Sequence, residues 1–348
     1  MAKTTPEDWM KYMTIYDIAE KSGVSIATVS RILNGGKNVS EKTRKKVLAV
    51  MKEEKYTPNI FARGLGLDSI RMIGLLCTDV SDIYYAKAVS ILEKELHQKG
   101  FDVLLYCTGT QPEDKKKSLQ MLLEKRVDAV ILIGSAFKEE ADNSHLEEAA
   151  KKVPLFIING LAEFPGISCV VCDEHGAVME NVSALYEQGC HRILYLYDAL
   201  TSSGFQKLDG YRDGLEHCGL LWDNALAVRV EKSLESAKQA VLRLFREAIP
   251  FDAVMTSEDL LAVGAQKALQ QMNITMPIIG FNNSLLAECA TPSLTSVDNM
   301  LDTLCPFTVG LLLRLLKGEE APNKTIVSAK LVERETFQRL KHQKEAIK

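Results

Sequence analysis

Residues 14–36 read TIYDIAEKSGVSIATVSRILNGG, and this stretch predicts two short helices joined by a tight turn. Thr14 and Asp17 have the spacing of a capping box, in which the first residue's side chain and the fourth residue's side chain satisfy each other's backbone N–H groups. Gly23 can adopt the left-handed conformation that commonly ends a helix. Ser25 has a side chain that can cap a second helix. The local sequence therefore predicts a helix-turn-helix unit.

The second of these helices is rich in serine, threonine, valine and isoleucine. Val24 and Val29 occupy the positions of a hydrophobic staple, and Val29 shares the buried side of the helix with two more apolar residues, Ile32 and Leu33. The residues left on the opposite face are Ile26, Ala27, Ser30 and Arg31. Short side chains let a helix enter the DNA major groove, where a guanidinium can bind guanine and apolar groups can meet thymine methyls. The pattern predicts a recognition helix.

A third helix is predicted to begin at Ser40 and to run through Val47 and Met51. Its exposed positions carry basic side chains suited to DNA phosphates, namely Lys42, Arg44, Lys45 and Lys46. Residues 1–71 hold 13 Lys and Arg against 8 Asp and Glu, whereas the remaining chain holds 29 against 38. A basic head on an acidic body is typical of a nucleic-acid-binding module joined to a different unit.

Composition excludes several classes of protein. The chain has 348 residues, of which 46% are hydrophobic and 25% charged, as in a globular protein of two or three packed units. The longest apolar runs, such as AVILIG at 129–134, are far shorter than the roughly 20 residues of a membrane span. The polar start of the chain lacks a signal-peptide core. We expect a cytoplasmic protein without a membrane partner.

Neither metal binding nor catalysis is predicted. The eight cysteines include one CxxC pair, Cys169 and Cys172, which falls in a predicted strand and would point its thiols to opposite faces. The six histidines lack metal-ligand spacing, and the sequence contains no GxxxxGK loop and no GxSxG elbow. We therefore expect no catalytic residue, no metal and no cofactor.

From Arg71 onward, apolar β-rich segments alternate with amphipathic segments of helical length. This alternation predicts parallel sheets covered by helices on both faces. About 270 residues exceed one comfortable core, so two lobes are predicted, with a ligand-binding cleft at the carboxyl ends of the strands.

The sequence resembles the lactose-repressor (LacI/GalR) family of bacterial transcription regulators over about residues 14–335. The resemblance rests on TIYDIAEKSGVSIATVSRILNG, VSEKTRKKVLAVM, YTPNIFARGL, IGLL, GYRDGL, EDLLAVGA and IIGFNN. It implies a homodimer or a dimer of dimers that binds a pseudopalindromic operator and changes its affinity for DNA when a small molecule binds the body. A sugar-binding protein or enzyme of the same two-lobed fold, without operator binding, is the alternative.

The resemblance also implies a domain layout: an all-α helix-turn-helix head at 14–56, a hinge helix or linker at 57–70, and a periplasmic-binding-protein-like α/β body at 71–340. The first lobe is expected near residues 72–168 plus 299–325, and the second near 169–298 plus 326–340. In the hinge, Leu65 matches a leucine inserted between bases and Ala62 a dimer contact, although a plain flexible linker is the alternative. The predicted DNA-contacting residues are Thr14, Ile15, Tyr16, Ser25, Ile26, Ala27, Thr28, Ser30, Arg31, Asn34, Ser40, Arg44, Tyr56, Asn59, Ala62 and Leu65.

The predicted effector-binding residues are Tyr84, Tyr85, Ser135, Asn159, Lys207, Glu258, Asn282 and Asn299. Lys207, Glu258 and Asn282 stand where the family commonly has arginine, asparagine and aspartate. Glu258 can accept hydrogen bonds from adjacent hydroxyls, and Lys207 can donate to a hydroxyl or a carboxylate, so a sugar or a sugar acid is expected. Alternatively, Lys207 and Glu258 pair with each other across the cleft without touching a ligand.

Overall fold

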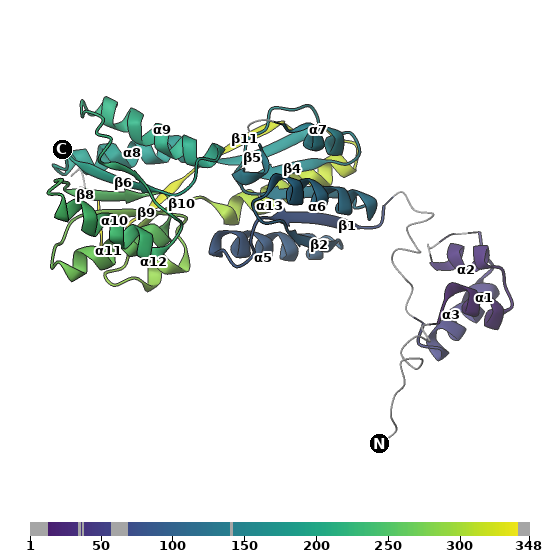
Figure 1. Cartoon of the computed structure of the whole chain (residues 1–348). Coiled ribbons are helices and arrows are strands. Elements are labelled where there is room, and N and C mark those ends of the chain that lie inside the picture. Colours follow the sequence, from purple (N-terminus) through teal and green to yellow (C-terminus); the bar gives the residue numbers. More distant parts are fainter. Residues whose placement is uncertain (1–12, 34–35, 37, 57–68, 140–141, 340–348) are drawn as a thin grey trace, which may run out of the picture. The chain divides into compact units, whose positions relative to one another are not determined.

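The structure is a computed structural model, and it describes residues 13–33, 36, 38–56, 69–139 and 142–339. Its contacts divide the chain into two compact units, Met1–Arg71 and Met72–Lys348 (Figure 1).

The first unit contains three helices, α1 (Ile15–Ser22), α2 (Ile26–Leu33) and α3 (Glu41–Glu53). The predicted capping box is present, because Asp17 donates its N–H to Thr14 Oγ1 and accepts the N–H of Thr14 at 2.7 Å. Gly23 ends α1 with a φ of 61°. The core of this unit is made by residues from all three helices, Ile18, Ala19, Val29, Ile32, Val47 and Met51. The local sequence signals therefore produced the predicted helix-turn-helix.

The second unit has two six-stranded sheets. The first sheet has the order β11-β5-β4-β3-β1-β2, and its strands are β1 (Met72–Cys77), β2 (Asp102–Cys107), β3 (Ala129–Ile133), β4 (Leu155–Ile158), β5 (Ile167–Asp173) and β11 (Lys324–Ser328). The second has the order β12-β10-β9-β8-β6-β7, and its strands are β6 (Ile193–Tyr197), β7 (Ala227–Arg229), β8 (Ala253–Thr256), β9 (Ile278–Phe281), β10 (Thr295–Asp298) and β12 (Lys330–Val332). All described pairings are parallel except that of β12 with β10.

The helices of this unit are α5 (Ile83–Gln98), α6 (Pro112–Glu124), α7 (Ser144–Ala150), α8 (Glu174–Glu187), α9 (Ser202–His217), α10 (Leu234–Arg246), α11 (Asp259–Gln271), α12 (Leu285–Cys289) and α13 (Leu301–Leu316), with a 3-10 helix at Ser135–Phe137. A buried cluster joins α5 and α13 to the first sheet. Separate clusters join α10 and α11 to one face of the second sheet and α8 and α9 to the other. The body is therefore two α/β lobes with their own cores, as predicted.

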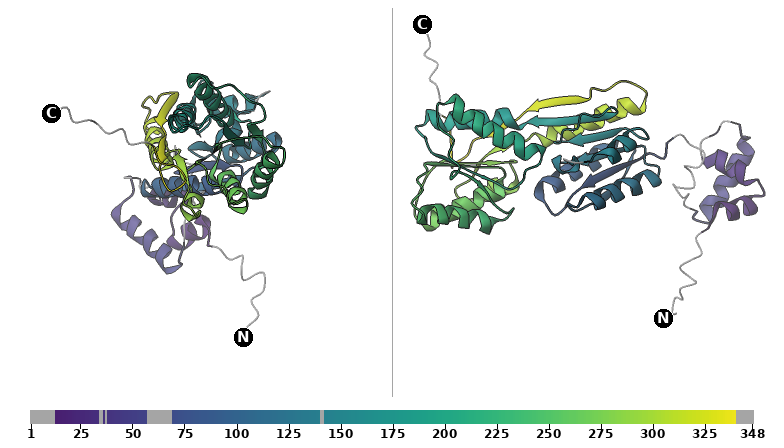
Figure 2. Two further views of the ribbon diagram at one scale, coloured as in Figure 1. Left: turned by 90° about the vertical axis from the view of Figure 1, so that its left-hand side faces the viewer. Right: turned by 45° about the horizontal axis from the view of Figure 1, so that its top comes forward.

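The chain crosses between the lobes three times, after β5, after β10 and after β11. The expected boundaries at 168/169 and 325/326 were wrong, because each falls inside a strand of the first sheet. β5 pairs with β4 and with β11 over its length, so the first lobe continues to Asp173 and resumes through Ser328. Figure 2 shows β11, in yellow, running beside the teal strand β5 from a distant part of the sequence.

Candidate functional site

In the head, the exposed face of α2 carries the side chains predicted to read DNA. Ile26 is 41% exposed, Ala27 and Arg31 are also exposed, and Thr28 and Ser30 are half-buried. Val29 and Ile32 are buried on the opposite side against α1 and α3. The face is thus free of acidic residues and presents one long cationic side chain among short ones.

Other described head residues that were predicted to contact DNA make hydrogen bonds at the starts of the helices. Ser25 Oγ accepts the N–H of Thr28 at 3.2 Å and lies 2.9 Å from Thr28 Oγ1. Ser40 caps α3 by accepting the N–H of Thr43. Arg44 is half-buried and donates to the carbonyl of Gly36, so it links the first turn of α3 to that residue.

Four of the predicted residues lie near the ends of the head's described segment. Thr14 caps α1, Ile15 and Tyr56 pack partly against the core, and Tyr16 is 66% exposed. Four further predicted DNA contacts lie outside the described residues, namely Asn34, Asn59, Ala62 and Leu65.

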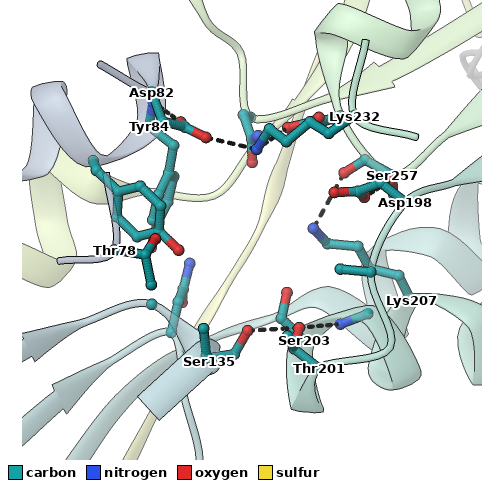
Figure 3. Close-up of a pocket in the computed structure, with 18 of the residues that line it drawn as sticks. Thr78, Asp82, Tyr84, Ser135, Asp198, Thr201, Ser203, Lys207, Lys232 and Ser257 are labelled. Carbon is teal, nitrogen blue, oxygen red and sulfur yellow. Dashed lines mark hydrogen bonds and ion pairs between the residues drawn. The ribbon is translucent and has the colours of Figure 1, made fainter. Parts of the chain in front are cut away.

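In the body, a cavity of about 380 Å³ lies between the two lobes at the carboxyl ends of the strands (Figure 3). Seven of the eight predicted effector-binding residues line it: Tyr84, Tyr85, Ser135, Asn159, Lys207, Glu258 and Asn282. The eighth, Asn299, is buried behind the wall and donates to Asn282 Oδ1 at 2.9 Å. The position of this cavity agrees with the rule that open α/β sheets bind ligands beyond the carboxyl ends of their strands.

Unusual backbone conformations at strand ends shape the cavity. Gly134, Asn159 and Asn282 have φ values of 97°, 51° and 99° directly after β3, β4 and β9. Glycine and asparagine tolerate this region better than other residues. A Cβ on Gly134 would lie 2.7 Å from the Tyr85 ring, so glycine also leaves room for that ring. Strained positions of this kind collect at ligand sites.

Two tyrosines form an aromatic wall on the first lobe. The rings of Tyr84 and Tyr85 meet edge to face, with centroids 5.3 Å apart and planes inclined at 77°. Burial raises the pKa of both phenols, so both remain protonated at neutral pH. Across the cleft, Ser135 Oγ donates to Thr201 Oγ1 of the second lobe at 2.8 Å.

Lys207 is held by groups of the protein around its ammonium. Its Nζ donates to the Ser257 carbonyl at 3.2 Å (Figure 3). The same Nζ lies 3.5 Å from Glu174 Oε1. It also lies 4.1 Å from the centroid of the Phe281 ring, a distance suited to a cation–π contact. The alternative pairing of Lys207 with Glu258 was therefore wrong, because Glu174 is the carboxylate partner of this lysine.

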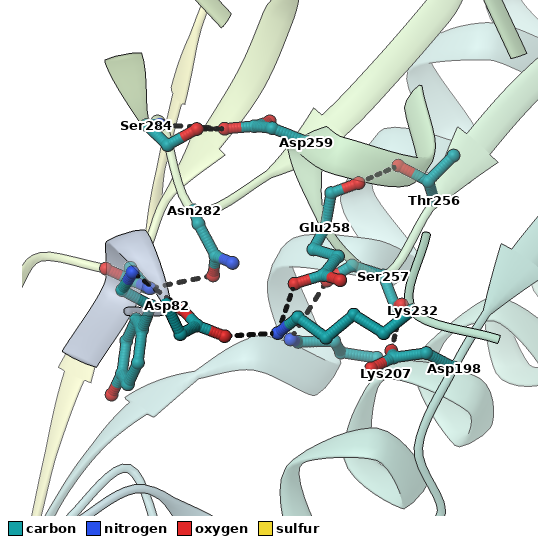
Figure 4. Close-up of polar contacts among 12 residues, drawn as sticks. Asp82, Asp198, Lys207, Lys232, Thr256, Ser257, Glu258, Asp259, Asn282 and Ser284 are labelled. Carbon is teal, nitrogen blue, oxygen red and sulfur yellow. Dashed lines mark hydrogen bonds and ion pairs between the residues drawn. The ribbon is translucent and has the colours of Figure 1, made fainter. Parts of the chain in front are cut away.

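Glu258 instead pairs with Lys232, which also reaches the other lobe. Lys232 Nζ lies 2.7 Å from Glu258 Oε2 and 2.6 Å from Asp82 Oδ2 (Figure 4). Burial alone opposes the charge on Lys232, but the carboxylates of Glu258 and Asp82 outweigh it and raise the pKa of the ammonium. Lys232 is therefore a cationic bridge between the lobes at the mouth of the cavity.

The second oxygen of Glu258 has no hydrogen-bond partner among the residues that the structure describes. Glu258 is 7% exposed, and its Oε1 is buried without a hydrogen bond to any described residue. Burial raises the pKa of this carboxyl to about 7, against the attraction of Lys232. Since a buried polar atom normally has a partner, this unpaired oxygen, on a residue that lines the cavity, is a candidate acceptor for a hydrogen-bond donor of a ligand.

The sequence reasoning missed Asp82, Glu174, Asp198 and Lys232, all of which line the cavity. Glu174 and Asp198 directly follow β5 and β6, Lys232 follows β7 by three residues, and Asp82 caps α5. Listing the charged residue after each predicted strand would have identified three of them, because the carboxyl ends of parallel strands share one edge.

Among the described residues, no group of three or more His, Cys, Asp and Glu side chains could hold a metal ion. In the same part of the chain, no helix is long and apolar enough to cross a membrane.

The head and the cavity together define a DNA-binding head on a two-lobed ligand-binding body. The profile of bacterial regulatory proteins of the lacI family matches residues 14–59, and that of periplasmic binding proteins and the sugar binding domain of the LacI family matches residues 71–321. The chain belongs to the LacI family of bacterial transcription regulators.

Three known proteins illustrate the relationship. An HTH-type transcriptional regulator of Lachnoclostridium phytofermentans is 48% identical over 330 residues, which cover 93% of this chain and 99% of the relative. The HTH-type transcriptional regulator DegA of Bacillus subtilis is 32% identical over 82% of this chain and 86% of its own length. The crystal structure of the Lac repressor dimer bound to operator and the anti-inducer ONPF has a TM-score of 0.82, with 26% identity over 94% of this chain and 99% of that chain.

Proposed function

We propose that this protein is a transcriptional repressor that binds an operator through α2 and changes its affinity for that operator when a small molecule binds between the lobes. The observation that carries the proposal is the combination, in one chain, of a basic recognition face on α2 and a polar interlobe cavity with an unpaired buried oxygen. We assign DNA binding to residues 14–56, a hinge or linker to 57–70, and effector binding and dimerisation to the body.

Within the head, Arg31 is the residue we assign to base reading. It is exposed, and it is the only long hydrogen-bond donor on α2. A bidentate arginine contact discriminates between bases by about 1 to 3 kcal/mol. Lys45 on α3 is exposed as well, and we assign it to phosphates, which carry no sequence information.

In vitro selection from random duplexes, followed by fluorescence anisotropy, tests this assignment. We expect the intact chain to select a pseudopalindromic site. Arg31→Ala should lose about 1 to 3 kcal/mol per half-site on that site and relax the preference for one base, whereas Lys45→Ala should weaken selected and random DNA alike. Equal losses on both kinds of DNA for Arg31→Ala would remove its base-reading role.

A homodimer is part of the proposal, with a dimer of dimers as the alternative assembly. The Lac repressor of the matching structure is a dimer on its operator. A pseudopalindromic site requires two recognition helices related by two-fold symmetry. Sedimentation equilibrium of the intact chain distinguishes the two assemblies.

Binding to operator DNA also places the protein in the cytoplasm, and no catalytic role is proposed.

For the effector, we propose a polyhydroxylated molecule of the sugar class. The cavity combines a tyrosine wall, on which a ring face can stack, with the acceptor oxygen of Glu258 and the hydroxyls of Ser135 and Thr201. Such a mixture of apolar surface and a few polar groups is typical of small-molecule sites. Of the two expected classes, a sugar agrees with this lining better than a sugar acid, since Lys207 already has a carboxylate partner in Glu174.

A further inference from the structure

The cavity has a strong excess of negative charge. Five carboxylates line it, those of Asp79, Asp82, Glu174, Asp198 and Glu258, against the two ammonium groups of Lys207 and Lys232. The formal balance is three negative charges in a cleft with low-dielectric walls. Such clefts concentrate cations and repel anions.

Neither ammonium group is available to offset a ligand's negative charge. Lys207 is engaged by Glu174, the Ser257 carbonyl and the Phe281 ring. Lys232 is engaged by Asp82 and Glu258 on opposite lobes. An anionic ligand would have to break one of these ion pairs and approach the remaining carboxylates.

Two carboxylates have capacity left for a donor. Glu258 Oε1 is buried without a partner among the described residues. Asp198 lines the same cavity and accepts a hydrogen bond from the Ser257 hydroxyl at 2.7 Å. The protein already places one ammonium between carboxylates here, since Lys232 bridges Asp82 and Glu258.

We propose that the effector carries a protonated amine beside its hydroxyls, and that this amine binds Glu258 Oε1 in the field of Asp198. This inference rests on the proposed function only in taking the interlobe cavity as the effector site. It narrows the ligand to an amino sugar or a similar amino polyol.

Binding of such a cation has a second consequence. Burial raises the pKa of Glu258 to about 7, so near neutral pH a substantial fraction of this carboxyl is protonated in the empty protein. A bound ammonium favours the carboxylate and therefore expels that proton. We expect proton release when an amine binds, whereas Glu258→Gln abolishes that release.

Isothermal titration of the intact chain with matched sugars tests the proposal. Three pairs are titrated, glucosamine with glucose, galactosamine with galactose, and mannosamine with mannose, together with N-acetylglucosamine and glucuronic acid. At least one amine should bind about tenfold or more tightly than its hydroxyl parent, as expected for a hydrogen bond between charged groups. N-acetylglucosamine, which keeps the nitrogen but loses the charge, should lose that advantage.

Several outcomes would overturn the proposal: a neutral sugar or the uronic acid binding as tightly as any amine, or no amine binding at millimolar concentration. Repeating the titration in two buffers of different ionisation enthalpy measures the proton release. Glu258→Gln should reduce the amine preference at least tenfold. Glu231→Gln is the matched control, because Glu231 is exposed and lies outside the cavity lining.

Failure of this inference can be distinguished from failure of the proposed function. A wild-type chain that selects an operator but binds no amine retains its role as a DNA-binding regulator. A chain that binds an amine but selects no DNA retains its amine site and loses the proposed regulatory role.

Discussion

Replacing Glu258 by glutamine should change the pH dependence of stability in a defined direction. The carboxyl is 7% exposed, and burial raises its pKa from the ordinary 4.5 to about 7. Because the folded-state value is raised, the stabilising contribution is fully present below pH 4.5 and is lost as the pH rises through 7. Glutamine keeps the shape and an acceptor for Lys232 but does not ionise.

The magnitude follows from the two pKa values. A tenfold change in proton affinity corresponds to about 1.4 kcal/mol, so the ionised carboxylate costs the folded protein up to about 3 kcal/mol at pH 8. At pH 5 the cost is below about 1 kcal/mol, since the folded carboxyl is then almost fully protonated. The free energy of unfolding of Glu258→Gln relative to wild type should therefore increase by about 2 to 3 kcal/mol from pH 5 to pH 8.

Urea unfolding of the ligand-free chain at pH 5, 6, 7 and 8 measures this difference. Other titrating groups, such as Asp259, are common to both proteins and cancel in the comparison. Glu231 lies on the exposed loop beside Lys232, so the free energy of unfolding of Glu231→Gln should change with pH as that of wild type does. The same pH profile for Glu258→Gln and wild type would refute the reasoning, because it would mean that the buried carboxyl titrates as in the unfolded chain.

Three further predictions concern Lys232, Gly210 with Gly310 as its control, and Gly23. Lys232→Met removes the shared cation of Asp82 and Glu258, so it should destabilise the body by about 1 to 3 kcal/mol at pH 8 and by less at pH 5, where Glu258 is protonated; equal losses in urea unfolding at both pH values would argue against that protonation. Gly210→Ala should destabilise the second lobe by about 1 to 3 kcal/mol, because its Cβ would lie 2.4 Å from the His175 carbonyl, whereas Gly310→Ala, with nothing within 4 Å, should be neutral or stabilising by up to about 1 kcal/mol. Gly23 has a φ of 61°, which is unfavourable for alanine, so Gly23→Ala should lower the stability of the head by about 1 kcal/mol. An unchanged midpoint of thermal unfolding would contradict this expectation.

The sequence predicted the head well because its signals are local. Each signal involves residues only a few positions apart. These signals are the capping box of Thr14 and Asp17, the left-handed Gly23 and the buried side of α2. The prediction of the body's two α/β lobes rested on hydrophobic periodicity, which can be seen in the sequence without knowledge of tertiary contacts.

The lobe boundaries could not be predicted in the same way. The extent of β5 in the first lobe depends on its pairing with β4 and with β11, and β11 lies about 150 residues later in the sequence. The partner of Lys207 was missed for a similar reason, because Glu174 begins α8 and Lys207 lies on α9, so the two side chains meet only when these helices pack together. Contacts between residues far apart in the sequence, rather than weak local structural preferences, therefore limited the prediction of the lobe boundaries and of the site.

Affinity for the selected operator with and without a ligand in the cavity tests the central claim most directly. Fluorescence anisotropy would follow the intact chain on its operator, first alone and then saturated with the tightest-binding sugar of the titration panel. Since coupling between two sites in one protein typically changes affinity by 5- to 150-fold, we predict a change of at least about fivefold, in either direction. Operator affinity that stays the same at saturation would contradict the claim that the interlobe cavity controls DNA binding.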